Sequence, residues 1–297
     1  MNEQPLVTVI VPYYNNDNEK FLHACFNSIK NQSYASIELI VVDDGSSEKA
    51  ASMLREFQAE YTFLLLKQKN KGISGALNTG IQHANGKYIS CIAADDFWAR
   101  EKIEQQVNYL ESAGPEVAAC CTNGYYVFEN DPSKTAPSLN RILQPGDLTF
   151  EGILKLNAVM AISVMIRKEI FSEIGLFDEN SVIEDWDMWL RLTDKYVMGY
   201  LPAPLVYYRR HSNNRSNNFD KSWYDSVYYI FQKWKHKNGQ REAVINLKLA
   251  ALNNFSRHQK LAALKIACSN PQLLNHWLYW RGFFKILIPG FLYSKKE

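Results

Sequence analysis

The sequence contains little that would point to a disulfide framework, a zinc site or a nucleic-acid partner. Its five cysteines are odd in number, scattered and without a CxxC pair, which favours free, buried thiols in a reducing compartment. With 33 basic against 31 acidic residues, the net charge is only +2 at pH 7. No chain-wide positive field exists to hold a nucleic-acid backbone, and we therefore expect no nucleic-acid partner.

A signal-peptide pattern is also absent near Met1. Residues 1–5 lead directly into a strand-like run, without a basic region followed by a long apolar one. The sequence therefore predicts a cytoplasmic protein. At 297 residues, 46% of them apolar, the chain is long enough to bury a sizeable globular core.

Strand-like and helix-like segments alternate in the first hundred residues. Apolar, β-branched runs predict buried strands, and amphipathic stretches predict helices between them. This alternation predicts an α/β fold with a mostly parallel, doubly wound sheet. The expected strands cover residues 6–12, 37–42, 62–67 and 88–93, and the expected helices cover residues 19–31, 48–60 and 72–84.

The sequence changes character at about residue 117. Residues 117–128, 158–168 and 196–208 predict strands of a mixed sheet, and a polar connection covers residues 129–147. After residue 218 the pattern is helical. We therefore expect a catalytic domain over residues 1–218, with halves 1–115 and 116–218, and a helical extension over residues 219–297.

Three acidic pairs stand at the expected element ends. Asp43-Asp44 and Asp95-Asp96 close strands, and Glu184-Asp185 opens a Trp-rich helix. In open parallel sheets, ligands bind beyond the carboxyl ends of the strands, where Pro12, Asp44, Gly72 and Asp95 all fall. Carboxylates gathered in one crevice repel each other unless a cation or polar ligand lies between them. The sequence thus predicts a metal and a polar ligand there.

Six motifs in order resemble the family 2 glycosyltransferases over roughly three-quarters of the chain. This resemblance implies a GT-A fold and an inverting enzyme that takes a sugar from a nucleotide diphosphate, expected to be UDP. The motifs are VTVIVPYYN at 7–15, VVDDGSS at 41–47, NKGISGALNTGI at 70–81, AADDFW at 93–98, EDWDMWLRL at 184–192 and YRRHSNNRS at 208–216.

The resemblance implies that Pro12, Tyr14 and Asp44 hold the nucleobase, and that Lys71 and Gly72 lie beside the nucleotide. A carboxylate can accept the imide N–H of uracil, and Gly72 would let the backbone approach a ligand. Residues 43–46 fit equally well as a strand-ending turn with a helix N-cap.

By the same resemblance, Asp95 binds both the nucleotide and a divalent cation, Mg²⁺ or Mn²⁺, with His211 as a further metal contact. Ala93 replaces the first aspartate of the family's metal motif, which departs from the family pattern. For Asp96 we favour a different role, as the N-cap of a helix beginning near Trp98.

Asp185 is the general base that the resemblance implies, and Glu184 and Trp186 lie on the acceptor side. A neighbouring Glu184 would raise the pKa of the carboxylate pair, which suits a base near neutral pH. The alternative is an acidic first turn that the helix dipole stabilises.

Residues 277–293 combine an apolar stripe with basic residues. They are too short and too interrupted to span a bilayer, but they fit a helix at a membrane surface, and a helix docked on protein fits as well. A membrane contact would make a polyprenyl-linked saccharide acceptor plausible at the inner face of the cell membrane. Rival functions are a nucleotidyltransferase and a non-catalytic nucleotide-sugar-binding protein.

Overall fold

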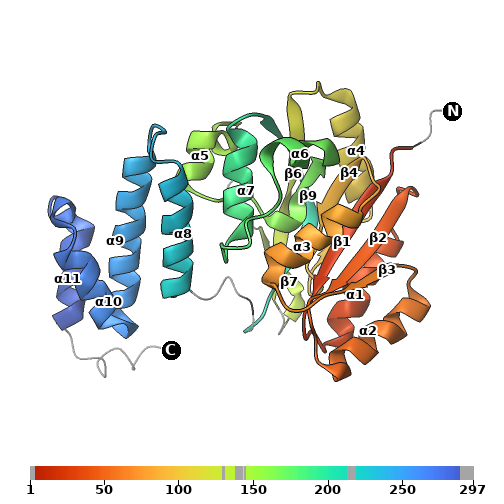
Figure 1. Cartoon of the computed structure of the whole chain (residues 1–297), viewed down its shortest axis with the longest axis horizontal. Coiled ribbons are helices and arrows are strands. Elements are labelled where there is room, and N and C mark those ends of the chain that lie inside the picture. Colours follow the sequence, from red (N-terminus) through yellow and green to blue (C-terminus); the bar gives the residue numbers. More distant parts are fainter. Residues whose placement is uncertain are drawn as a thin grey trace. The chain divides into compact units, whose positions relative to one another are not determined.

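The computed structural model describes residues 4–128, 131–137, 143, 145–212, 214 and 219–287. The chain forms two compact units, Met1–Ser212 and Asn213–Glu297. Figure 1 shows the helices and strands of both units.

The described strands of the first unit form one mixed sheet. Its order is β3-β2-β1-β4-β8-β6-β9-β5, and β7 pairs with β6. Strands β1 to β4 are parallel, whereas β8 runs antiparallel to both β4 and β6. The predicted parallel sheet with a mixed second half is therefore confirmed. The strands are β1 Val7–Tyr13, β2 Ile37–Asp43, β3 Leu64–Lys67, β4 Tyr88–Cys91, β5 Phe97–Trp98, β6 Val117–Phe128, β7 Asp131–Pro137, β8 Met165–Arg167 and β9 Val197–Arg210.

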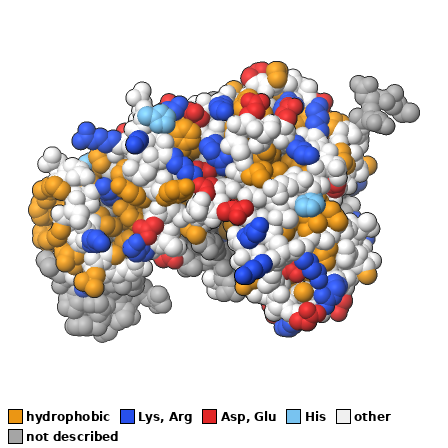
Figure 2. All heavy atoms as spheres, viewed as in Figure 1, with side chains coloured by type: hydrophobic (Ala, Val, Ile, Leu, Met, Phe, Trp, Pro, Cys, Tyr) orange, Lys and Arg blue, Asp and Glu red, His pale blue; other side chains and the backbone are white. Residues whose placement is uncertain are grey.

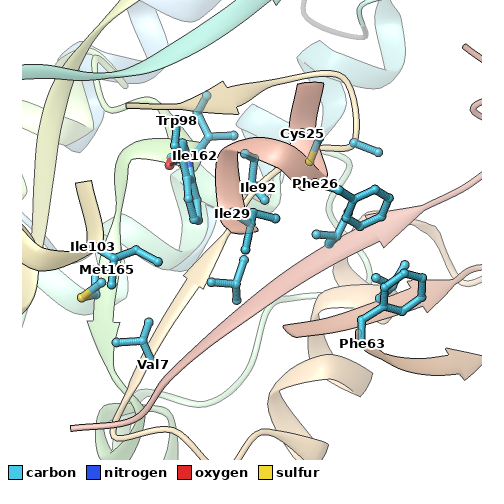
Figure 3. Close-up of a cluster of buried hydrophobic side chains, with 14 of the residues drawn as sticks. Val7, Cys25, Phe26, Ile29, Phe63, Ile92, Trp98, Ile103, Ile162 and Met165 are labelled. Atoms are coloured by element: carbon cyan, nitrogen blue, oxygen red, sulfur yellow. Dashed lines mark hydrogen bonds between the residues drawn. The ribbon is translucent and has the colours of Figure 1, made fainter. Parts of the chain in front are cut away.

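Helices cover both faces of the parallel strands. Val9 of β1 belongs to a core with α1 (Glu19–Lys30), α2 (Glu48–Glu60) and α4 (Lys102–Ser112). Figure 3 shows this core, with Cys25, Phe26 and Ile29 of α1 among its labelled side chains. The next residue, Ile10, points to the opposite face, where it contacts α3 (Gly72–His83): a Cβ on Gly80 would lie 2.6 Å from Ile10 Cγ2.

Two predicted segments differ from the structure. The strand expected over residues 158–168 is a 3₁₀ turn, Ala161–Ser163, followed by the short β8. In this turn, the carbonyl groups of Ile162 and Ser163 accept hydrogen bonds from side chains: Trp98 Nε1 donates to Ile162 O, and Gln106 Nε2 donates to Ser163 O. Within the polar connection expected over residues 129–147, residues 131–137 form a strand, β7, which pairs with β6.

The remaining helices of the first unit lie near the end of its chain. They are α5 Phe150–Lys155, α6 Phe171–Ile174 and α7 Glu184–Thr193, with 3₁₀ turns at Pro145–Leu148 and Lys168–Ile170. The second unit contains α8 Lys221–Lys233, α9 Gln240–His258, α10 Lys260–Cys268, a 3₁₀ turn at Pro271–Leu273 and α11 Trp277–Leu287.

Helices α9, α10 and α11 share a small apolar core that includes Leu252, Phe255 and Tyr279. The predicted helical character after residue 218 is confirmed over residues 219–287, and the end of the expected 277–293 segment lies outside the described residues. Among the described helices, none has the length and apolar character that crossing a membrane requires. The five cysteines are free. Three of them are buried as expected, but Cys91 is partly buried and Cys268 is exposed.

Candidate active site

Asp44 connects the end of β2 to the loop before α3. Its side chain is 3% exposed, and its Oδ1 accepts hydrogen bonds from Gln68 Nε2 at 2.6 Å and from Lys71 N at 2.8 Å. Gly45 follows with a φ of +80°, and a Cβ there would lie 2.8 Å from Asn70 N, so only glycine fits this turn. Three of the predicted nucleotide contacts, Asp44, Lys71 and Gly72, are thus brought together.

The turn after β1 packs beside the turn after β2. Pro12 belongs to β1 itself, while Asn15 has a φ of 49° and bonds across to the neighbouring turn: Asn15 N donates to Ser46 Oγ at 3.0 Å, and Ser47 N donates to Asn15 Oδ1 at 2.8 Å. Tyr14 is 54% exposed at this edge. An exposed aromatic ring beside a buried carboxylate can stack on a planar base while the carboxylate accepts its N–H.

Gly72 begins α3 with a φ of +74°, and a Cβ at this position would meet nothing within 4 Å. The glycine is therefore required by the backbone conformation and leaves open space where a side chain would stand. The first turn of α3 directs unsatisfied N–H groups toward this edge, which suits a negatively charged ligand.

Asp95 and His211 meet at the carboxyl edge although they are 116 residues apart in the sequence. His211 Nε2 lies 2.8 Å from Asp95 Oδ2, and their side chains are 12% and 24% exposed. The His211 ring packs on Phe21, with centroids 5.6 Å apart. Arg209 supports this pair, since its Nε donates to Asp95 O at 2.9 Å. One carboxylate and one imidazole are a donor set that a divalent cation accepts when ligand oxygens complete its shell.

Among the described residues, no group of three or more His, Cys, Asp and Glu side chains could hold a metal ion by itself. The Asp95–His211 pair fits a cation that shares its shell with a bound diphosphate, because Mg²⁺ in phosphate sites is held by one or two carboxylates and by the substrate.

Asp96 does not cap a helix, contrary to the prediction. Phe97 and Trp98 form strand β5 against β9, and α4 begins only at Lys102. Asp96 is 1% exposed, and its Oδ1 accepts a hydrogen bond from Arg209 N at 2.7 Å. Its Oδ2 has no hydrogen-bond partner in the described part of the chain. Burial, and then the Asp95 charge, raises the Asp96 pKa well above its usual range. Through its bond to Arg209 N, Asp96 holds the end of β9, two residues before His211.

Asp185 stands in the first turn of α7, where Asn157 Nδ2 donates to its Oδ2 at 3.1 Å and Trp186 N donates to its Oδ1 at 2.7 Å. Burial raises the pKa of the Asp185 carboxyl, and these two hydrogen bonds oppose the rise. Burial is thus the largest cause of the raised Asp185 pKa, whereas the sequence suggested the negative charge of Glu184 as the cause. A carboxylate with a raised pKa is a stronger base than an ordinary aspartate.

A small cavity of about 30 Å³ lies beneath the Glu184-Asp185 pair and is lined by Leu77, Ile89, Cys91, Ala161, Val164, Ile166, Phe177, Glu184, Asp185 and Trp189. Burial, with a smaller contribution from Glu184, raises the pKa of the Cys91 thiol to about 12. Cys91 ends β4, four residues before Asp95. The α7 carboxylates therefore lie beside the strand that leads to the Asp95–His211 pair.

Trp186, expected on the acceptor side, is 8% exposed, and its Nε1 donates to Ile153 O of α5 at 2.8 Å. Its ring packs inside the domain and joins α5 to α7. Of the two acceptor-side residues, Glu184 is the less buried.

Three polar residues that the sequence reasoning missed support this site. Gln68 bonds to Asp44, Asn157 bonds to Asp185, and Asn78 bonds to the loop before α7. Gln68 directly follows β3, so the strand-end rule that selected Asp44 could have selected it. Asn78 and Asn157 carry no comparable local signal.

Comparison with known proteins gives a family match. Residues 8–175, more than half of the chain, match the family described as "Glycosyl transferase family 2". The "Uncharacterized glycosyltransferase RP339" of Rickettsia prowazekii is 30% identical over 192 residues, covering 63% of this chain and 58% of that protein. The chain therefore spans less than two-thirds of the length of this relative.

Two further relatives carry more specific names. The "Putative teichuronic acid biosynthesis glycosyltransferase TuaG" of Bacillus subtilis is 27% identical, covering 75% of this chain and 88% of that protein. The "UDP-Glc:alpha-D-GlcNAc-diphosphoundecaprenol beta-1,3-glucosyltransferase WfgD" of Escherichia coli is 26% identical, covering 63% and 69%.

Solved structures support the fold. S. aureus TarS 1–349 in complex with UDP-GlcNAc aligns with a TM-score of 0.66 at 15% identity, covering 95% of this chain and 88% of that chain. Mannosyltransferase PcManGT from Pyrobaculum calidifontis, in complex with GDP-Man and Mn²⁺, aligns with a TM-score of 0.60 at 18% identity, covering 99% and 89%.

Proposed function

Since the chain belongs to glycosyl transferase family 2, we propose that it moves a sugar from a UDP-sugar donor to a hydroxyl group of a saccharide or polyprenyl-linked saccharide, with inversion at the anomeric carbon. The observation that carries the proposal is the environment of Asp185. This carboxylate has a pKa raised by burial, and Asn157 orients it beside the strand leading to Asp95 and His211.

Asp185 is the general base. Its Oδ atoms accept the proton of the acceptor hydroxyl as the oxygen attacks the anomeric carbon, and the bond from that carbon to the diphosphate breaks on the opposite side. Burial makes the Asp185 carboxylate more basic, while the hydrogen bonds from Asn157 and Trp186 favour its unprotonated form, and a general base needs both. Glu184 faces the acceptor beside it.

The nucleotide lies along the edge formed by the turns after β1, β2 and β3. Asp44 orients the base, Pro12 and Tyr14 flank it, and Lys71 with Gly72 faces the diphosphate. Asp44 already accepts two hydrogen bonds on Oδ1, which fixes its carboxylate plane before a ligand arrives.

Asp95 and His211 would hold Mg²⁺ or Mn²⁺, and the ion would supply charge stabilisation to the departing nucleotide. The Mn²⁺ and GDP-Man named with the archaeal structure support this assignment by analogy. Because Ala93 replaces the first aspartate of the family's metal motif, Asp95 is the aspartate of this motif that would bind the cation.

The catalytic domain covers residues 1–218, with a nucleotide-binding half over 1–115 and an acceptor half over 116–218. The enzyme works in the cytoplasm, in the assembly of a bacterial surface polysaccharide. The names of TuaG and WfgD support this acceptor class.

Replacing Asp185 with Asn tests the proposal. We expect kcat to fall by a factor of about 10² to 10⁴, as for loss of a general base, while the Kd for UDP stays within about two-fold. Turnover is measured as UDP release during transfer from a panel of UDP-sugars with Mn²⁺. UDP binding is measured separately, as the increase in melting temperature that UDP produces.

Asp194→Asn, at the other end of α7, is the matched control and should retain activity. Near-normal turnover by Asp185→Asn would remove this residue from its role. Release of pyrophosphate in place of UDP would make the protein a nucleotidyltransferase, and binding without turnover would make it a binding protein.

A further inference from the structure

Helix α11 of the second unit exposes large apolar side chains along one side. Trp277, Trp280 and Phe284 are 68%, 44% and 57% exposed, and Leu274, just before the helix, is 43% exposed. At 3.6 residues per turn, Trp277, Trp280, Arg281 and Phe284 fall within an arc of about 100°. We call this surface the aromatic face. A contiguous apolar surface of this kind marks an interaction site more often than chance exposure does.

The opposite side of α11 is already used for packing. Tyr279 is 6% exposed, and a Cβ on Gly282 would lie 2.8 Å from Leu252 Cγ of α9, so α11 approaches α9 closely at this glycine. Phe283 and Ile286 pack against the same core. The core of the unit therefore forms mainly on the side opposite the aromatic face. Trp280 links the two sides, since its ring packs on Tyr279 and Phe283, whereas Trp277 and Phe284 remain more than half exposed.

Positive charge accompanies the aromatic face. The described residues 260–287 contain four basic residues and no acidic one, a net +4, whereas residues 1–259 contain 27 basic and 30 acidic residues, a net −3. Residues Trp277–Leu287 include Arg281 and Lys285 and no acidic residue. The Arg281 guanidinium lies 5.8 Å from the Trp277 ring centroid. Figure 2 shows hydrophobic side chains gathered over α11.

We propose that the aromatic face of α11 docks on the surface of an anionic lipid bilayer. Tryptophan and phenylalanine insert at the boundary between headgroups and acyl chains, and lysine and arginine pair with lipid phosphates. The helix is too short to cross the bilayer, so it lies in the surface plane.

A second copy of the chain is the less suitable occupant. Two such faces would bring the Arg281 and Lys285 charges of both copies together, and the repulsion between them opposes self-association. An anionic lipid surface instead neutralises this charge, with each basic residue adding to the attraction. The proposal stands apart from the proposed sugar transfer, since docking requires neither donor nor acceptor.

Vesicle sedimentation of the full chain tests the docking. We expect the protein to sediment with phosphatidylcholine vesicles that contain phosphatidylglycerol and to stay in solution with phosphatidylcholine alone. Trp277→Ser combined with Phe284→Ser should lower the partition coefficient by about ten-fold or more. Both residues are more than half exposed, so the fold should tolerate the change.

Leu64→Ser combined with Val197→Ser is the matched control, because these residues are 46% and 50% exposed in the first unit. This control should bind vesicles like the wild type. Arg281→Gln combined with Lys285→Gln should weaken binding to the anionic vesicles, and added salt should have the same effect. Tryptophan quenching by brominated lipids, in the wild type, gives a readout that needs no variant.

Equal sedimentation with both vesicle types, unchanged binding of the Trp277 and Phe284 variant, or absence of quenching would each overturn the proposal. A wild-type dimer that this variant converts to a monomer, without vesicle binding in either, would make a second copy the occupant. Because no readout involves a sugar, each of these failures leaves the proposed glycosyl transfer untouched.

Discussion

Asn157 lowers the pKa of the Asp185 carboxyl through a hydrogen bond. Its Nδ2 donates to Asp185 Oδ2, and this hydrogen bond lowers a pKa that burial raises. Replacing Asn157 with Ala removes the donor, so the Asp185 pKa should rise further. Since a base works only when unprotonated, the acidic limb of the kcat/KM profile should move to higher pH, with activity lost more at pH 6 than at pH 8. Measuring kcat/KM across this range checks the shift.

Asn27→Ala, at an exposed position of α1, is the control and should leave the profile in place. A uniform loss of kcat/KM at every pH, with an unmoved limb, would mean that Asn157 affects only the position of Asp185. Asn157→Asp would add a negative charge beside the base and should move the limb in the same direction as Asn157→Ala.

At the scale of single residues, the sequence identified the groups that carry charge but not those that tune them. Asp44, Asp95 and Asp185 stand in motifs whose local pattern marks an element end. Asn157 acts on Asp185 from the loop after α5, 28 residues earlier, and no local pattern distinguishes it from a surface asparagine. The sequence also could not predict the raised pKa of Asp96, because the burial that causes it depends on the whole fold.

At the scale of elements, α3 holds the loop that leads into α7. Asn78 Nδ2 donates to Phe177 O at 2.9 Å and to Glu179 Oε1 at 3.1 Å, and Asn78 Oδ1 accepts from Phe177 N at 2.9 Å. The planar side-chain amide of Asn78 thus donates to and accepts from the backbone of one residue at the same time. Arg191 of α7 fixes the start of the same loop, since its Nη2 donates to Leu176 O at 2.9 Å.

Asn78→Asp should therefore misplace α7 and Asp185. The new carboxylate faces Phe177 O and the Glu179 carboxylate without a donor, which should cost about 2 to 3 kcal/mol of folding stability. We expect kcat to fall by about ten-fold or more, because a general base that shifts by 1 Å loses its reach. Gln82→Glu, the same amide-to-acid change at an exposed position of α3, should be neutral. Urea unfolding and steady-state kinetics measure both effects, and lost stability with unchanged kcat would contradict the positioning role.

The sequence predicted helices and strands correctly where the local apolar pattern determines the secondary structure. It was wrong where pairing with distant segments determines it. The first strands and helices follow the apolar period of their own sequence. Phe97-Trp98 is extended because it pairs with Val206 and Tyr207, more than one hundred residues later. The capping preference of Asp96 is thereby lost, since no helix begins there. The strand β7 likewise depends on β6 and not on its own composition.

At the scale of the whole molecule, a buried lysine makes folding stability depend on pH. Lys102 is 0% exposed, its Nζ donates to Ser90 Oγ at 2.5 Å, and its ammonium lies 3.7 Å from the Trp98 ring centroid. Burial lowers the Lys102 pKa from 10.5 to about 7. The nearby Cys120 and Cys91 thiols offset this effect only in part, and the Trp98 ring and the Ser90 hydroxyl are the partners that the ammonium contacts.

The sign of the dependence follows from proton binding. Between pH 7 and 10.5, the unfolded chain keeps the Lys102 proton and the folded chain releases it, so the free energy of unfolding rises with pH. Below pH 7, Lys102 is protonated in both states, and the folded state bears the full cost of burying the ammonium. Between pH 6 and 8, Lys102 should raise the free energy of unfolding by about 1 kcal/mol. The Cys91 and Cys120 thiols, with pKa values raised to about 12, act in the opposite direction but only above their ordinary range near pH 9.

Lys102→Met should remove this dependence. The thioether fills a similar volume without a charge, so the variant should be more stable than the wild type at pH 6, and its advantage should shrink by about 1 kcal/mol at pH 8. Urea unfolding of both proteins at pH 6, 7 and 8 gives the difference directly, because all other titrating groups are common to the pair. Lys87→Met, at a half-exposed lysine paired with Glu111, should show no such trend. A constant difference between wild type and Lys102→Met over this range would mean that the buried amine keeps its proton in the folded protein.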